Sequence, residues 1–131
     1  LLACAELGDL SSLGPPGVKP GHVVCTVLVP HGYPGEHGTG FPFYGLTEVD
    51  SSVKVFHAGT EEKYLDPIVV RGRLFPVVGY RATGGRTLCV TCLDTTLESA
   101  ARRSRDAASL IADRSGGRLF FRKDIAKNVA E

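Results

Sequence analysis

Runs of apolar and β-branched residues along the chain predict about six β-strands. Residues 22–29 are apolar on both faces, which is the pattern of a buried strand. The other predicted strands cover residues 53–58, 68–70, 74–80, 87–93 and 119–125. Segments 68–70 and 74–80 are close enough in the sequence to form a hairpin. A turn is expected before this hairpin, at residues 61–67.

One long segment has helical periodicity instead. Residues 97–113 place their apolar side chains three and four positions apart, with charged residues mostly on the other face. Thr95 is the expected N-cap, and Glu98 completes a capping box with it. Gly116 and Gly117 end the helix. The predicted fold class is α+β, in which an antiparallel β-sheet, partly curled toward a barrel or sandwich, is covered by this helix.

Two segments lack strand periodicity. Residues 1–13 have apolar positions at helical spacing and predict a short helix or the last turns of one. Residues 31–45 are rich in glycine and proline, and a flexible linker of that kind would not carry large apolar rings. The aromatic residues in this segment, which predict an ordered loop, are Tyr33, Phe41, Phe43 and Tyr44.

Length and charge narrow the class of protein. The 131 residues suffice for one domain, and 15 basic against 14 acidic residues give a net charge of +1. Neither nucleic acid nor a membrane is therefore an expected partner, and a cytoplasmic location is the default. The sequence contains no methionine, so we expect it to be part of a longer protein.

Cysteine and histidine give no strong metal signal. Cys89 and Cys92 have a Cys-x-x-Cys spacing, but in a strand these positions face opposite sides, which predicts buried structural thiols. His31 and His37 share a loop without a third ligand, so loop hydrogen bonding is the favoured interpretation over zinc. No metal site is expected.

One cation stands out as a candidate for binding an anion. Gly84 and Gly85 precede Arg86, and a flexible backbone there would let amide groups and a guanidinium converge on one phosphate. The alternative is a structural turn with a surface arginine. His57, at the end of a strand, could reach a ligand or donate to a loop carbonyl. The arginines of the predicted helix are expected to form a solvated face.

Several short motifs occur in an order and spacing typical of one family. They are Gly32-Tyr33-Pro34-Gly35, Gly40, Gly45-Leu46, Phe56-His57-Ala58-Gly59-Thr60, Gly84-Gly85-Arg86 with Val90-Thr91, Thr96-Leu97-Glu98 and Phe121-Arg122-Lys123-Asp124-Ile125. Together they resemble the C-terminal domain of the phosphoribosylamine–glycine ligases, also called glycinamide ribonucleotide synthetases, which are ATP-grasp enzymes. The resemblance covers nearly the whole chain.

The resemblance implies a role in purine biosynthesis. Enzymes of this family join glycine to phosphoribosylamine with ATP and magnesium, and they bind these cofactors in an upstream ATP-grasp part. Residues 1–13 would be the end of a helix of that part, and residues 14–131 the C-terminal domain. This domain would pack on the catalytic core and be inactive alone, with no cofactor and no catalytic residue of its own.

The resemblance also implies a substrate site. Arg86 matches the position expected near the ribose phosphate of phosphoribosylamine, and Gly84, Gly85, His57 and Thr60 accompany it. Residues 61–83 form a longer stretch than is usual in the family, which suggests an inserted hairpin. The alternative function is therefore a separate interaction or ligand-binding module that kept the fold without the chemistry.

Overall fold

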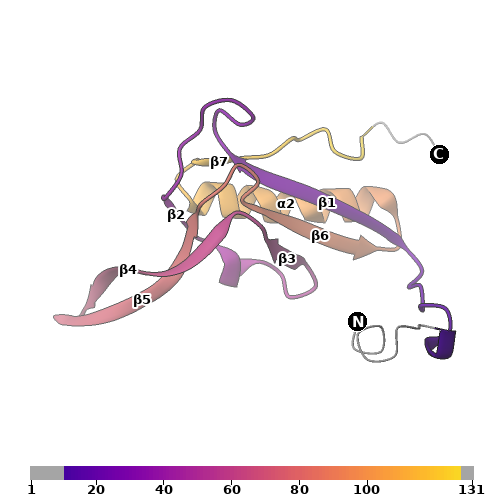
Figure 1. Ribbon diagram of the computed structural model, residues 1–131, viewed down its shortest axis with the longest axis horizontal. Coiled ribbons are helices and arrows are strands. Elements are labelled where there is room, and N and C mark those ends of the chain that lie inside the picture. Colours follow the sequence, from indigo (N-terminus) through magenta and orange to yellow (C-terminus); the bar gives the residue numbers. More distant parts are fainter. Residues whose placement is uncertain (1–10, 128–131) are drawn as a thin grey trace.

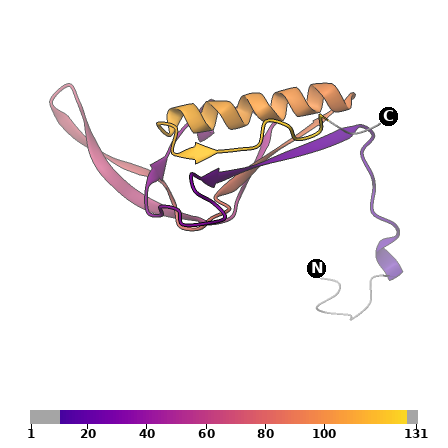
Figure 2. The same cartoon turned by 90° about the horizontal axis from the view of Figure 1, so that it is seen from above.

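The computed structural model describes residues 11–127, which form two antiparallel sheets and one long helix (Figure 1). The first sheet has the order β3-β6-β1-β7, with bounds Lys54–His57, Leu88–Asp94, His22–Pro30 and Leu119–Phe120. The second has the order β2-β5-β4, with bounds Pro42–Phe43, Arg73–Ala82 and Thr60–Val70. Helix α2 (Leu97–Arg114) lies along one face of the four-stranded sheet (Figure 2). The predicted α+β class with antiparallel pairing and a long helix is confirmed.

The described strands form open sheets and do not close into a barrel. The β4–β5 hairpin extends away from the body of the domain, as Figure 2 shows. The predicted partial curl toward a barrel or sandwich is therefore not confirmed. Local periodicity identifies strands, but it does not determine which strands pair when they are far apart in the sequence.

Strands β1 and β6 form the centre of the main sheet. Their register places Val27 opposite Cys89 and Thr26 opposite Val90. Alternate residues of both strands are buried under α2, while the other face of the sheet is open. The sequence predicts a strand at residues 22–29 that is buried on both faces, and this is wrong because the described residues cover one face only. Large apolar side chains exposed on the open face include Val23, Val27 and Leu93.

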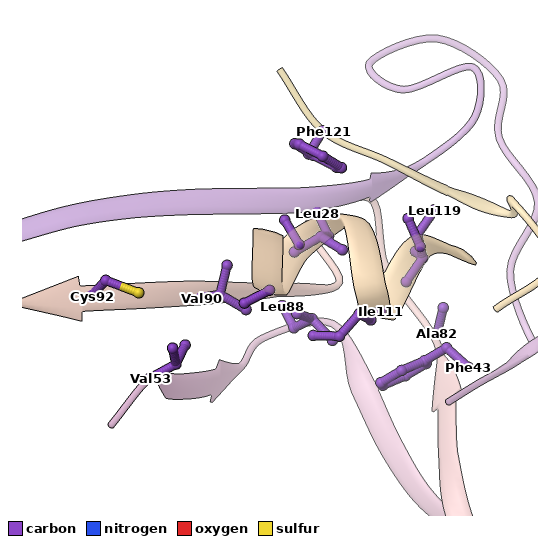
Figure 3. Packing of buried hydrophobic residues seen from close by; sticks show 13 residues of the cluster. Leu28, Phe43, Val53, Ala82, Leu88, Val90, Cys92, Ile111, Leu119 and Phe121 are labelled. Atoms are coloured by element: carbon purple, nitrogen blue, oxygen red, sulfur yellow. The ribbon is translucent and has the colours of Figure 1, made fainter. Parts of the chain in front are cut away.

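Helix α2 packs closely on this sheet because its buried face is made mostly of small residues. Five alanines, a serine and the larger Ile111 are its buried residues. Ile111 belongs to one core cluster with Leu28 of β1 and Leu88 of β6, and Figure 3 shows these side chains between the helix and the strands. Full burial of such a side chain contributes about 1.5–3 kcal/mol. The helical periodicity of the sequence thus identified the face that is buried.

The N-cap of α2 is Thr96, one residue later than predicted. The Oγ1 of Thr96 accepts a hydrogen bond from the amide of Ser99 at 3.2 Å. Thr95 is not the cap because its amide donates to the Oδ1 of Asp94 at 2.7 Å, which holds it in the preceding turn. Glu98 lies one position too early for a capping box with Thr96.

Asp94 joins the end of β6 to the first two turns of α2. Its Oδ2 accepts hydrogen bonds from the Oγ of Ser99 at 2.8 Å and from the Nη1 of Arg103 at 3.1 Å. The bonds from Ser99, from the Thr95 amide and from Arg103 lower the pKa of Asp94 from 3.8 to about 2. Arg103 is therefore a structural residue, and the prediction that the helix arginines form a solvated face is wrong at this position.

The β4–β5 hairpin is longer than predicted. The turn expected at residues 61–67 is instead part of strand β4, which pairs with β5 from Thr60 to Val70. Pro67 suggested a chain break, but it lies where the register shifts between Leu65 and Ile68, and β4 is an edge strand. A proline is tolerated in a bulge or at an edge because no ladder hydrogen bond needs its amide.

The two ends of the chain depart from prediction in different ways. The last strand, β7, covers only Leu119–Phe120 of the predicted 119–125. Residues 1–10 of the predicted N-terminal helix lie outside the described residues, and Ser11–Leu13 form a 3₁₀ turn. Within residues 11–127, no helix combines the length and apolarity needed to cross a lipid bilayer.

A buried hydroxyl pair connects α2 to both central strands. The Oγ1 of Thr26 and the Oγ of Ser104 are 2.7 Å apart, and the Ser104 hydroxyl also lies 3.2 Å from the carbonyl oxygen of Val90. Both side chains are fully buried. Removal of the Ser104 hydroxyl would leave the Thr26 hydroxyl buried without this hydrogen bond, whereas removal of Thr26 would leave Ser104 bonded to the Val90 carbonyl.

We expect Ser104→Ala to lower the free energy of unfolding by about 1–3 kcal/mol, because it leaves Thr26 unpaired. The double variant Thr26→Val with Ser104→Ala should lose less than the sum of the two single variants. Urea unfolding of the four proteins measures this coupling, with Ser109→Ala as the control on the same helix. Strict additivity of the two substitutions would contradict the interaction.

The Asp94 network predicts a pH dependence of stability. Because the pKa of Asp94 is lower in the folded chain (about 2) than the ordinary 3.8, its stabilising contribution is present above about pH 4 and is lost as the pH falls through about 2. Asp94→Asn should therefore lower the urea midpoint near neutral pH, and the difference from the unchanged protein should vanish toward pH 2. Asp66→Asn, at an exposed carboxylate of the hairpin, is the control. If the difference in urea midpoint between Asp94→Asn and the unchanged protein stays constant with pH, the charge of Asp94 is not the source of its contribution.

Candidate functional site

Two predicted motifs that are far apart in the sequence meet where β3 ends and β6 begins. The amide of Gly59 donates to the carbonyl oxygen of Arg86, and the amide of Thr83 donates to the carbonyl oxygen of Gly59, both at 2.8 Å. A Cβ on Gly59 would lie 2.8 Å from the Cα of Gly84 and 2.9 Å from the Arg86 oxygen. Glycine is needed at position 59 because two backbone segments approach too closely for a side chain.

The loop after β1 lies against Gly85. A Cβ on Gly85 would overlap the ring of Tyr33 and would lie 3.2 Å from the Nε2 of His37. The rings of Tyr33 and His37 are themselves in edge-to-face contact, with centroids 5.7 Å apart. Neither Gly84 nor Gly85 has a positive φ angle. The sequence suggests that these glycines provide a flexible backbone, but the structure assigns Gly85 to close packing with an aromatic residue.

These contacts border an open hollow that we call the Arg86 hollow. It has a volume of about 610 Å³, and its lining includes Val27, Tyr33, His37, Gly59, Gly85 and Arg86. A second hollow of about 460 Å³ shares Val27, Tyr33 and Arg86 with it and continues past Phe120 to Arg122. Hollows of this size match those that bind small molecules. Arg86 is the charged residue common to both.

Arg86 differs from the other arginine of these hollows in its partners. The guanidinium of Arg122 is held by Asp124, with an Nη2 to Oδ2 distance of 2.5 Å. That bond raises the pKa of Arg122 and lowers the pKa of Asp124. Arg86 is exposed, and its side chain has no hydrogen bond or ion pair within residues 11–127. Its guanidinium is thus free to bind an anion.

His57 and Thr60, the other two predicted site residues, contact each other. The Nδ1 of His57 lies 3.0 Å from the Oγ1 of Thr60, and the imidazole packs on Tyr80 with ring centroids 4.4 Å apart. Neither residue belongs to the lining of the Arg86 hollow. Gly85 and Arg86 therefore come together in the hollow, whereas Gly84 is outside its lining and packs on Gly59, and His57 and Thr60 lie at the turn that leads into β4.

The two cysteines of the Cys-x-x-Cys sequence face opposite sides of the sheet, as predicted. Cys92 is buried under α2, and burial raises the pKa of its thiol. Cys89 is only half-buried on the open face, so the prediction that both thiols are buried is wrong for it. Burial raises the pKa of Cys89, and a hydrogen bond with the thiol of Cys25 raises it further. Cys25 pairs with Thr91, and Cys89 lies two positions before Thr91 on β6. Cys25 and Cys89 are therefore diagonal neighbours on the same face of the sheet.

The histidines do not gather into a metal centre. His31 packs on Phe120 with ring centroids 5.8 Å apart, whereas His37 packs on Tyr33. Within residues 11–127, no three side chains of His, Cys, Asp or Glu lie close enough to hold a metal ion. The Nδ1 of His37 lies 2.7 Å from the carbonyl oxygen of Gly35, which is the loop hydrogen bonding favoured from the sequence.

Sequence reasoning missed Tyr33 and His37 as residues of the site. Each lies about 50 positions before Arg86, and no local pattern joins them to it. The aromatic content of residues 31–45 correctly indicated an ordered loop. The only trace of the contact in the sequence is glycine at position 85, where any side chain would collide with Tyr33.

The arrangement is suited to binding an anionic ligand. One unpaired guanidinium faces a hollow whose walls are an aromatic ring, an imidazole and glycine backbone. A guanidinium binds phosphate or carboxylate through two parallel hydrogen bonds. The hollow therefore has the composition of a binding site for a small anion with an attached apolar or sugar group.

Comparison with known protein families matches residues 23–128 to the phosphoribosylglycinamide synthetase C domain. This match covers both sheets except the first residue of β1, as well as α2 and the Arg86 hollow. All of the residues proposed from the sequence as substrate contacts fall within it.

Among characterised relatives, the phosphoribosylamine–glycine ligase of Synechocystis is 36% identical over 126 residues, which is 95% of this chain and 26% of the relative. The ligase of Caulobacter vibrioides is 33% identical over 126 residues, with the same two shares. The ligase of Escherichia coli K12 is 36% identical over 106 residues, which is 80% of this chain and 21% of the relative. The chain thus spans about a quarter of the length of the relatives that it matches, and it belongs to the phosphoribosylglycinamide synthetase C-domain family.

Proposed function

We propose that residues 14–131 are the C-terminal domain of a ligase that joins glycine to phosphoribosylamine with ATP and magnesium in purine biosynthesis. The family match and the names of the relatives support this proposal. In it, residues 1–13 end a helix of the upstream ATP-grasp part, and that part binds ATP and the metal. The 131 residues alone have no ligase activity, and the complete enzyme acts in the cytoplasm.

We propose that Arg86 binds the phosphate of phosphoribosylamine. The observation that carries this role is the unpaired guanidinium at a hollow bordered by Gly59, Gly85 and Tyr33. The backbone bond from Gly59 to the Arg86 carbonyl fixes the point from which the side chain extends. Gly84 packs on Gly59 and Gly85 packs on Tyr33, so both help to hold the backbone that carries Arg86, and His57 with Thr60 holds the adjoining turn.

The open face of the four-stranded sheet supports packing on an upstream part. An antiparallel sheet with one free face usually presents polar residues to water, yet this face exposes several large apolar side chains. They are Val23, Val27, Phe56 and Leu93. We propose that the catalytic core covers this face, which continues into the Arg86 hollow through Val27.

In the complete ligase, we expect Arg86→Ala to raise the Michaelis constant for phosphoribosylamine about 10- to 100-fold, because a charge-assisted hydrogen bond to phosphate is lost. The Michaelis constants for ATP and glycine and the melting temperature should change little. Arg86→Lys should recover only part of the loss, since an ammonium group keeps the charge without the bidentate geometry.

Steady-state kinetics with thermal melts measure these effects. The matched control is Arg102→Ala, which removes an exposed arginine of α2 far from the hollow. An unchanged dependence on phosphoribosylamine in Arg86→Ala would refute the phosphate role. A collapsed melting temperature would show instead that Arg86 is structural.

The packing proposal predicts that activity requires both parts. The 131 residues alone should form no ADP from ATP, glycine and phosphoribosylamine, whereas adding the separately produced upstream part should restore ADP formation. Val23→Lys should raise the concentration of the chain needed for half-maximal activity about 10-fold or more, because one valine no longer buries its side chain. Val18→Lys, at a largely exposed position outside the sheet, is the control.

Ligase activity of the 131 residues alone would contradict the proposal that the catalytic residues lie in the upstream part. If the Val23→Lys and Val18→Lys chains reach half-maximal activity at the same concentration, the open face is not the contact surface.

A further inference from the structure

The imidazole of His37 has one nitrogen engaged and one available. Its Nδ1 lies 2.7 Å from the carbonyl oxygen of Gly35. A carbonyl oxygen can only accept, so Nδ1 must carry the proton of this bond. In the neutral ring the Nε2 is then unprotonated and acts as a hydrogen-bond acceptor. The loop geometry thus selects one tautomer of His37.

The free nitrogen lies at the Arg86 hollow. The Nε2 is 3.2 Å from the point where a Cβ of Gly85 would be, and His37 belongs to the lining of the hollow together with Arg86. Within residues 11–127, the Nε2 has no hydrogen-bond partner. The residue is half-buried, and the ring of Tyr33 fixes its orientation by edge-to-face contact. A rigidly held acceptor therefore lies in the same hollow as an unpaired cation.

Two groups of opposite character narrow the class of ligand. The guanidinium of Arg86 can only donate and binds an anion, while the neutral Nε2 of His37 can only accept. An oxyanion without a proton, such as sulfate at neutral pH, satisfies the first group and not the second. A ligand that satisfies both carries a phosphate and a hydroxyl group a few bonds away, as a pentose phosphate does.

We propose that His37 is a ligand-binding residue whose Nε2 accepts a hydrogen bond from a sugar hydroxyl of the ligand that Arg86 holds by its phosphate. This inference rests on the proposed phosphate role of Arg86 and adds the second contact. It gives Gly85 a further function, because a side chain there would displace both Tyr33 and His37. Discrimination between a sugar phosphate and an anion without a hydroxyl group, such as sulfate, then depends on His37, and overall anion affinity depends on Arg86.

The experiment compares two probes, ribose 5-phosphate and sulfate, on the 131-residue chain. Dissociation constants come from NMR titration of the Gly85 and Arg86 amides. His37→Phe keeps an aromatic ring against Tyr33 but removes the acceptor. We expect it to weaken the binding of ribose 5-phosphate about 3- to 10-fold, the scale of one hydrogen bond, and to leave the binding of sulfate, which has no hydrogen to donate, unchanged. His37→Gln, whose Oε1 can take the place of Nε2, should restore most of the affinity.

The outcomes separate this inference from the proposed function. Arg86→Ala should weaken both probes, and failure to do so would refute the phosphate role itself. Suppose instead that Arg86→Ala weakens the binding of both probes as expected. If His37→Phe then leaves both affinities unchanged, or changes them equally, the role of His37 alone is refuted. Failure of His37→Gln to recover ribose 5-phosphate binding would likewise overturn the acceptor role.

Discussion

The close approach of Gly59 to Gly84 and Arg86 determines the geometry on which the rest of the structure depends. At this point the chain leaves the four-stranded sheet for β4 and returns from β5 into β6. Two backbone hydrogen bonds of 2.8 Å hold the crossing, and a Cβ at position 59 would prevent them. Because Arg86 contributes its carbonyl oxygen to the crossing, its backbone is fixed while its guanidinium stays free. The contact that joins the two sheets therefore also positions the cation of the candidate site.

The parts of the fold that could be predicted are those encoded by neighbouring residues. Strands β1 and β6 follow from runs of apolar and β-branched residues, and helix α2 follows from apolar positions three and four residues apart, which report its buried face. The errors come from competing contacts that periodicity does not report. Asp94 binds the amide of Thr95 and so moves the helix cap to Thr96, while a bulge accommodates Pro67 and lets β4 continue through the predicted turn.

The candidate site was predictable only in part, because it is assembled from segments that are distant in the sequence. Arg86 was identified from the two glycines before it, although the reason for Gly85 is contact with Tyr33 and not a positive φ angle. Tyr33 and His37 reach the hollow through a loop whose conformation no local pattern specifies. Conversely, His57 pairs with Leu88, two residues after Arg86, but its imidazole contacts Tyr80 and Thr60, and no local pattern in the sequence indicates that direction.

The open face and the Arg86 hollow depend on each other physically if the proposed function is correct. An exposed guanidinium binds phosphate weakly because water competes for both groups and salt screens their attraction. Covering the apolar face that surrounds Val27 would exclude that water and lower the local dielectric constant, which strengthens a charge-assisted hydrogen bond. Packing on a catalytic core would thus convert a weak surface cation into an effective phosphate contact. By this argument, the isolated domain contains the geometry of the site without most of its affinity.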